Sequence, residues 1–144
     1  MVASTFDRAN SLGYLANRLS RQLAAALQHD LGPLGLTAGQ FAVLLELDTT
    51  DGLTQAALSA RLSVEQPSMA QTVARLRRDG LVRQSAHEGD RRASRLWLTD
   101  KAREALPPAV AAAERTNEHA LGALAPDEAD ALITTLRRLV DAAG

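Results

Sequence analysis

Apolar residues recur at helical spacing near the N-terminus of the chain. Between about Asn10 and Asp30, five leucines follow one another at intervals of three and four residues, namely Leu12, Leu15, Leu19, Leu23 and Leu27. An α-helix makes one turn in about 3.6 residues, so this spacing gathers the leucines on one side. We therefore predict an amphipathic helix of about five turns with a single apolar stripe.

A second helix is predicted to start after Thr37. The segment Thr37-Ala38-Gly39-Gln40 has the spacing of a capping box, in which two side chains at the start of a helix satisfy backbone amides reciprocally. The turn-rich cluster Thr49-Thr50-Asp51-Gly52 should end this helix. Its apolar residues are Phe41, Val43, Leu44, Leu45 and Leu47.

Two shorter helices and a hairpin come next. Thr54 is placed to cap the first of these helices. The second helix follows Ser63-Val64, tolerates Pro67 in its first turn and ends at Gly80. Alternation of apolar and polar residues over 81–86 and 95–98 predicts the two strands of a hairpin.

Two further helices complete the predicted fold, which is mainly α with a small β-hairpin. A long helix should run from Thr99 to about Ala123, and Pro107-Pro108 should bend or break it near Leu106 because proline has no backbone N–H. Pro126 opens the last helix. Small residues in the long helix suit close packing between subunits, and they include Ala109, Ala111, Ala112 and Ala113.

The two short helices indicate a helix-turn-helix, in which the second helix enters the DNA major groove. At about 100° per residue, Met69, Val73 and Leu76 form its buried side. The opposite side is polar and cationic, and we predict that it contacts DNA through Ser68, Gln71, Thr72, Arg75 and Arg78. Glutamine pairs with adenine, arginine with guanine, and serine or threonine with bases or phosphates. A helix side that is polar only because it faces water is the alternative interpretation.

Charge is distributed unevenly along the chain, although its formal net charge is only -1. Between Arg61 and Arg103 there are ten basic residues against five acidic ones, a local charge of +5 that favours a polyanionic partner. The predicted hairpin follows the second helix of the helix-turn-helix, the recognition helix, and we call this hairpin the wing. On the wing, Arg91, Arg92 and Arg95 could contact phosphates or enter the minor groove. Asp90 would repel DNA if it were free, so we predict that it orients an arginine.

Several function classes are excluded or disfavoured by what the sequence lacks. The chain has no cysteine, and its three histidines, His29, His87 and His119, show no metal-ligand spacing. We find no glycine-rich phosphate loop and no G-x-S-x-G turn, so we predict neither an enzyme nor a cofactor nor a metal site. No apolar run approaches the roughly 18 residues of a membrane span. We therefore expect a cytoplasmic protein that does not contact the membrane.

These segments resemble the MarR-type winged helix-turn-helix regulators. The resemblance rests on the segments at 53–58, 64–68 and 76–82, and on Asp90-Arg91-Arg92-Ala93 leading into Leu96-Trp97-Leu98-Thr99. It extends to Thr37-Ala38-Gly39-Gln40-Phe41 and to Leu124-Ala125-Pro126-Asp127-Glu128, and so covers nearly the whole chain. The recognition helix departs from many relatives at Ala70 and Gln71, so the operator sequence cannot be transferred.

The resemblance implies a division of labour along one compact chain. Residues 1–36 would form an N-terminal dimerisation helix, 37–99 the winged helix-turn-helix, and 100–144 the C-terminal dimerisation helices. Arg92 would reach the minor groove with Asp90 orienting it. A homodimer also follows from symmetry, because two recognition helices about 34 Å apart fit a pseudo-palindromic site on double-stranded DNA.

The predicted function is a DNA-binding transcriptional regulator, and in particular a repressor released by a small ligand. Relatives commonly bind small aromatic or phenolic effectors between the dimer region and the DNA-binding lobe. Asn17, Arg21 and His29 lie near that region, but no secure set of ligand-binding residues emerges. A constitutive, ligand-independent DNA-binding or architectural protein is the alternative function.

Overall fold

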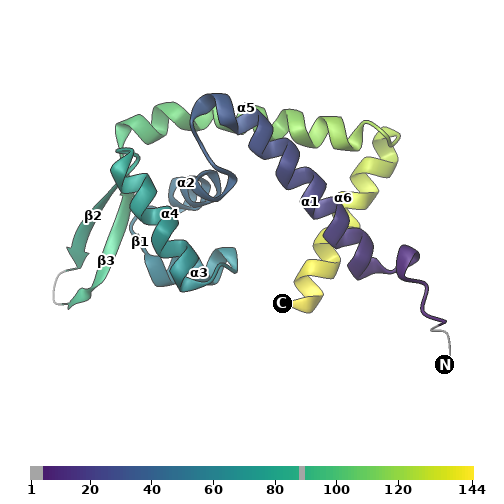
Figure 1. Ribbon diagram of the computed structural model, residues 1–144, viewed down its shortest axis with the longest axis horizontal. Coiled ribbons are helices and arrows are strands. Elements are labelled where there is room, and N and C mark those ends of the chain that lie inside the picture. The colour runs from purple at the N-terminus through teal and green to yellow at the C-terminus, as the bar shows by residue number, and fades with distance from the viewer. Residues whose placement is uncertain (1–4, 88–89) are drawn as a thin grey trace.

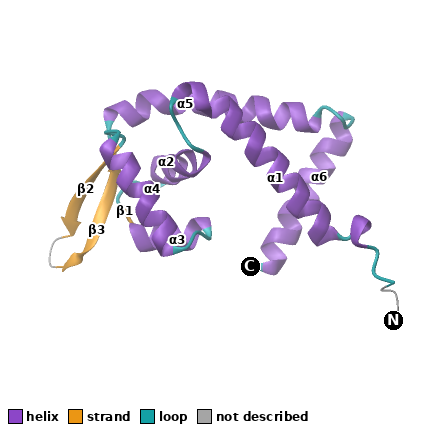
Figure 2. Cartoon of the chain, in the orientation of Figure 1, coloured by secondary structure: helices purple, strands orange, loops and turns teal. Residues whose placement is uncertain are grey.

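The computed structural model shows a mainly helical chain with one small sheet (Figures 1 and 2). It describes the backbone of residues 5–87 and 90–144. Within these ranges it describes all side chains except those of residues 86–87 and 90–93. Helix α5 runs along one side of the molecule, from the lobe that contains the wing to helix α6, and α1 crosses it (Figure 1). In chain order the elements are the 3-10 turn η1 (Arg8–Asn10), α1 (Leu12–Leu31), η2 (Gly32–Leu34), α2 (Ala38–Thr49), β1 (Leu53–Thr54), α3 (Gln55–Leu62), α4 (Gln66–Arg78), β2 (Val82–His87), β3 (Asp90–Leu98), α5 (Asp100–Leu121) and α6 (Pro126–Ala143).

The predicted helix starts are confirmed by their capping bonds. The hydroxyl of Thr37 accepts the Gln40 N–H at 3.1 Å, and the Gln40 side chain accepts the Thr37 N–H at 2.9 Å, which completes the capping box. Thr54 caps α3 by accepting the Ala57 N–H at 3.1 Å. Thr99 caps α5 in the same way. Each cap satisfies an amide that the helix itself leaves without an acceptor.

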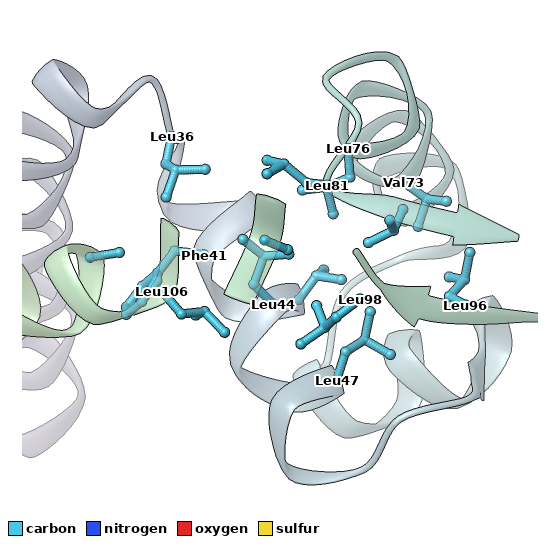
Figure 3. Close-up of a cluster of buried hydrophobic side chains, with 14 of the residues drawn as sticks. Leu36, Phe41, Leu44, Leu47, Val73, Leu76, Leu81, Leu96, Leu98 and Leu106 are labelled. Carbon is cyan, nitrogen blue, oxygen red and sulfur yellow. The ribbon is translucent and has the colours of Figure 1, made fainter. Parts of the chain in front are cut away.

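One apolar core holds the helix-turn-helix and the wing together. Side chains from α2, α4, the sheet and α5 meet there, as Figure 3 shows for Leu44, Leu76, Leu96 and Leu106. Leu44 and Leu76 are fully buried. Leu96 and Leu98 face inward from β3, as their alternation with Arg95 and Trp97 predicts. The core therefore fixes the position of α4 relative to the hairpin.

The sheet has three strands, in the order β1-β3-β2, whereas the sequence predicted a hairpin alone. Strand β1 pairs antiparallel with β3 through Leu53 opposite Leu96 and Thr54 opposite Arg95. Two residues are too few to give an alternating pattern, so sequence inspection missed this strand. Its pairing joins the segment between α2 and α3 to the base of the wing.

Helix α5 continues through Pro107 and Pro108, so of the predicted bend or break near Leu106 the break is wrong, and the bend stays a prediction. The two prolines leave the carbonyls of Arg103 and Glu104 without their usual backbone donors. All four of these residues are exposed, so water can satisfy both carbonyls. The loss of two hydrogen bonds is tolerated because it occurs on the solvent side of the helix.

The packing of the α5 alanines also differs from the prediction. Ala109 and Ala112 are completely buried in the core of their own chain, and Ala113 is partly buried against it. Helix α5 packs against α1 of the same chain, and small side chains let the two helices approach closely. Ala109, Ala112 and Ala113 therefore serve packing within the chain, and the inference of inter-subunit packing is wrong for these three. Ala111 lies outside this core, so its role in packing between subunits stays a prediction.

Candidate nucleic-acid interface

Helix α4 presents one side to the core and the opposite side to solvent. Met69, Val73 and Leu76 are buried, as their spacing predicts. Ser68, Gln71 and Arg75 are exposed, and the structure shows no side-chain bond from them to another described residue. This side of α4 therefore offers a hydroxyl, an amide and a guanidinium to a ligand.

Two other predicted contact residues on α4 already have partners inside the chain. Thr72 is half-buried, and its hydroxyl donates to the Ser68 carbonyl at 3.1 Å. A Cβ added to Gly39 would lie 3.7 Å from that hydroxyl, which places Thr72 beside the start of α2. Arg78 donates to the carboxylate of Asp79 at 3.1 Å. Thr72 and Arg78 thus flank the exposed side of α4 rather than form its centre.

Asp79 joins α4 to both α2 and α5. Its carboxylate accepts a bond from the buried side chain of Gln40 at 3.2 Å, and Lys101 donates to its backbone carbonyl at 2.6 Å. The hydrogen bond from Arg78 lowers the pKa of Asp79, and the bond from Gln40 and the charge of Lys101 act in the same direction, against the effect of desolvation. The C-terminal end of α4 is thereby fixed to its neighbours.

The base of the wing is anchored to the turn between α2 and β1. Arg95 donates to the Gly52 carbonyl at 2.8 Å, and the Gly52 N–H donates to the Leu96 carbonyl at 2.9 Å. Trp97 packs on Gly52 and donates from its indole N–H to Ser85 at 2.7 Å. The Arg95 guanidinium is therefore part of this anchor.

The wing residues nearest the hairpin turn can be placed only in part. Asp90, Arg91 and Arg92 lie in β3, but their side chains are outside the described residues, and residues 88–89 are outside them altogether. The predicted contact of Asp90 with an arginine therefore stays a prediction. Arg83 on β2 lies over the Trp97 ring, with its guanidinium carbon 5.4 Å from the ring centroid. This contact holds one more cation on the wing, and sequence inspection did not single it out.

Asp51 links the wing to the first turn of α5. Its Oδ1 accepts the backbone N–H groups of Leu98 at 3.1 Å and Gly52 at 3.2 Å, and its Oδ2 lies 3.4 Å from Arg103. Arg103 also pairs with Asp100 at 3.3 Å. One carboxylate therefore connects the turn after α2, the end of β3 and the start of α5. Sequence inspection assigned Asp51 only to a turn, because its partners are distant in the sequence.

A cleft of about 340 Å³ lies between α3, α4 and the inner side of the wing. Gln55 and Gln66, at the first positions of α3 and α4, line it and are joined by a hydrogen bond of 3.4 Å. Gln84 and Ser94 line it from the sheet. The cleft walls are thus rich in uncharged hydrogen-bonding groups.

Comparison with known proteins identifies this arrangement. The family model described as "MarR family" matches residues 34–93, which span the helix-turn-helix and most of the wing. The transcriptional regulator HosA from Escherichia coli O157:H7 is 27% identical over 132 residues, which cover 92% of this chain and 96% of HosA. The transcriptional repressor CouR, solved bound to a 23-mer DNA duplex, superimposes with a TM-score of 0.85 and 29% identity over 97% of this chain and 99% of CouR. The chain is therefore similar to MarR-family regulators over its helix-turn-helix and in its fold.

This likeness indicates a DNA-binding transcriptional regulator, and the homologues of the chain are transcriptional regulators rather than enzymes. A further structural neighbour is BpsR from Bordetella bronchiseptica, which superimposes with a TM-score of 0.85 and 25% identity over 96% of this chain and 99% of BpsR. In BpsR, DNA binding is regulated by 6-hydroxynicotinic acid. Among the described residues of this chain, no helix is long and apolar enough to cross a membrane.

Proposed function

We propose that this regulator is a homodimeric repressor that binds a pseudo-palindromic operator and leaves it when a small aromatic carboxylate binds. The observation that carries the proposal is a pair of exposed surfaces on one chain. One is the polar and cationic side of α4, and the other is apolar and formed by α1 and α6. The first suits DNA and the second suits another copy of the chain.

The apolar surface is formed by helices that find little cover within the chain. No described residue of α6 is buried, and its apolar side chains are spaced on one side. Isolated copies would leave this surface in water, at a cost of about 25 cal/mol for each Å². Its exposed members are Leu12, Leu15 and Leu19 of α1, and Ile133, Leu136, Leu139 and Val140 of α6.

A twofold dimer through this surface would place one α4 on each side of the symmetry axis. Residues 1–36 and 100–144 then form the dimerisation region, and 37–99 form the DNA-binding region. Within the latter, we assign base reading to Ser68, Gln71 and Arg75, with Thr72 and Arg78 at the margins near the phosphates. A repeated half-site follows from the repeated helix.

For the wing we propose that Arg91 and Arg92 contact the minor groove or its phosphates, with Asp90 orienting Arg92. Arg95 has a partly buried hydrogen bond to Gly52, so it positions the wing and adds positive charge near the DNA. Repression is supported by the likeness to CouR, because a dimer seated on its operator excludes other proteins from that DNA. The proposed ligand of the regulator is chromosomal DNA, so we assign the protein to the cytoplasm.

An effector site is proposed between α1 and α5. A pocket of about 480 Å³ is lined there by His29, Arg115 and His119, together with Asp30, whose carboxylate accepts a 3.0 Å bond from Thr116. A neighbouring pocket adds apolar walls from Pro33, Leu34 and Pro108. A guanidinium beside imidazoles and apolar walls suits an aromatic carboxylate, the chemical class of the compound that regulates BpsR. Asn17 and Arg21 line a separate depression on α1, so of the three residues that lie near the expected effector region only His29 lines this pocket.

The experiment is selection of bound duplexes from a random pool by the full-length protein, followed by titration with hydroxylated aromatic carboxylates. An inverted repeat bound by two chains, and released by one of these compounds, is the expected result. Release should be lost in Arg115→Met, while DNA affinity without effector stays unchanged. A repeat that no compound releases would favour the constitutive alternative, and the absence of any selected sequence would overturn the proposed function.

A further inference from the structure

The exposed side of α4 carries small apolar residues among its polar ones. Pro67, Ala70 and Ala74 are all exposed on this helix. The region around them is rich in arginine, with a net charge of +5 between Arg61 and Arg103. Small apolar positions in such a surface form a patch that water does not stabilise and that the core does not use.

The patch is continuous with Gln71 on the helix surface. Pro67 precedes Gln71 by four residues and Ala74 follows it by three, so both are its neighbours on the same side of the helix. Ala70 lies one turn from both Pro67 and Ala74. Met69 and Val73 are buried and belong to the core side of the helix, whereas the three patch residues are exposed. A ligand that meets the amide of Gln71 must therefore also meet this apolar patch.

The patch fits the major groove of an A·T base pair. Adenine offers N6 and N7 to a glutamine amide, and its partner thymine carries the 5-methyl group, the apolar feature of this groove. Small side chains let the helix approach closely enough for a methyl contact, which a longer side chain would prevent. Guanine and cytosine present no such methyl group.

We propose that Pro67, Ala70 and Ala74 form a surface that recognises thymine methyl groups next to the adenine contacted by Gln71. This inference rests on the proposed function, because it assumes that α4 enters the major groove. It predicts that each operator half-site contains an A·T pair whose thymine methyl group contributes to affinity. The residues Ala70 and Ala74 then determine specificity although they form no hydrogen bond with DNA.

The experiment uses the full-length protein and the best duplex selected from a random pool. Each thymine in turn is replaced by deoxyuridine, which removes only the methyl group. We expect one or two positions in each half-site to lose about four-fold in affinity, the value for one buried methyl group. All other positions should show no change.

The variant Ala74→Gly tests which protein group meets the methyl group. The ratio of thymine to deoxyuridine affinity is measured within each variant, so a lower fraction of folded protein does not affect it. We expect Ala74→Gly or Ala70→Gly to reduce the ratio at the sensitive position to about one. The control Ala60→Gly changes an exposed alanine of α3 and should keep the ratio of the unmodified protein.

The outcomes separate the two hypotheses. A selected inverted repeat without any deoxyuridine-sensitive position would overturn this inference and leave the proposed function standing. A sensitive position whose ratio is unchanged in Ala70→Gly, Ala74→Gly and Pro67→Gly would also overturn it, because another residue would then meet the methyl group. Failure to select any sequence would overturn the proposed function itself.

Discussion

The Trp97 ring lies so close to Gly52 that a Cβ on residue 52 would come within 2.7 Å of Cη2. Gly52 also has a φ of 77°, in the left-handed region that side chains disfavour. Its carbonyl and amide bond to Arg95 and Leu96 at the same place. A residue without a side chain is thus required where the wing meets the turn after α2.

Gly52→Ala should therefore destabilise the protein strongly. The left-handed backbone alone costs about 1–2 kcal/mol for alanine, and displacement of the Trp97 ring should raise the total to about 3 kcal/mol or more. Denaturant unfolding measures this difference. The matched control is Gly35→Ala, because Gly35 has a φ of 73° with nothing within 4 Å of an added Cβ. Equal losses in the two variants would show that the ring contact contributes nothing.

Asp51→Ala should weaken the attachment of the wing to α5. It removes the acceptor of the Leu98 and Gly52 amides and the partner of Arg103, for an expected loss of about 1–3 kcal/mol in unfolding free energy. The control is Asp100→Ala, which removes the other, fully exposed partner of Arg103 and should cost under about 1 kcal/mol. If both changes cost the same, Asp51 does not hold the wing.

Asp79 should make the stability of the protein depend on acidic pH. Its pKa is lower in the folded protein than its ordinary value near 3.8, chiefly because Arg78 donates to it. The stabilisation is therefore complete above that value and is lost as the pH falls through the lower folded pKa. Denaturation midpoints of the unmodified protein and Asp79→Asn should differ at pH 6 and converge towards pH 2. A difference that stays constant over this range would contradict the assignment.

Arg92→Ala and Gln71→Ala should affect DNA binding in different ways. Loss of a cation near the phosphates should weaken binding to all sequences and reduce the salt dependence of the logarithm of affinity by about one unit. Loss of the glutamine amide should instead cost about 1–3 kcal/mol at one base pair. Fluorescence anisotropy at several salt concentrations measures both effects. Arg18→Ala, on α1, serves as the control with an unchanged slope.

Leu136→Glu should convert the proposed dimer into monomers. Leu136 lies on the apolar side of α6, and a charge there would have to be buried without a partner in the dimer. Analytical ultracentrifugation gives the oligomeric state. The control Leu45→Glu changes a leucine of the same 37% exposure on α2, outside the proposed interface, and should remain dimeric. A dimeric Leu136→Glu variant would move the interface elsewhere.

The parts of the fold that depend on local interactions were predicted from the sequence, whereas parts that depend on long-range contacts were missed. Capping residues such as Thr37, Thr54 and Thr99 act within one helical turn, so their sequence pattern was sufficient. Strand β1 was missed because its pairing with β3 joins residues more than forty positions apart. The fate of Pro107 depended on whether it faces water, which periodicity did not reveal.

The candidate interface likewise contains residues that the sequence predicted and side-chain partners that it did not. The exposed residues Gln71 and Arg75 were identified because the helix period determines which side faces away from the core. The partners of Arg95 and Arg78 were not, because Gly52 is distant in the sequence and the bond to Asp79 depends on rotamers. The helical period thus identified the exposed side of α4, whereas only the structure shows that Arg95 and Arg78 bond to other residues of the chain.

The prolines of α5 also bear on how binding at one end of the molecule could alter the other. Two consecutive missing backbone bonds lower the bending stiffness of the helix close to Arg103, which is tied to the wing through Asp51. Arg115 lies about two turns beyond Pro108, so a compound bound beside it would change the forces on this more easily bent segment. A slight change in the curvature of α5 would shift the DNA-binding region of each chain. The distance between the two α4 helices of the proposed dimer would then no longer match one turn of the duplex.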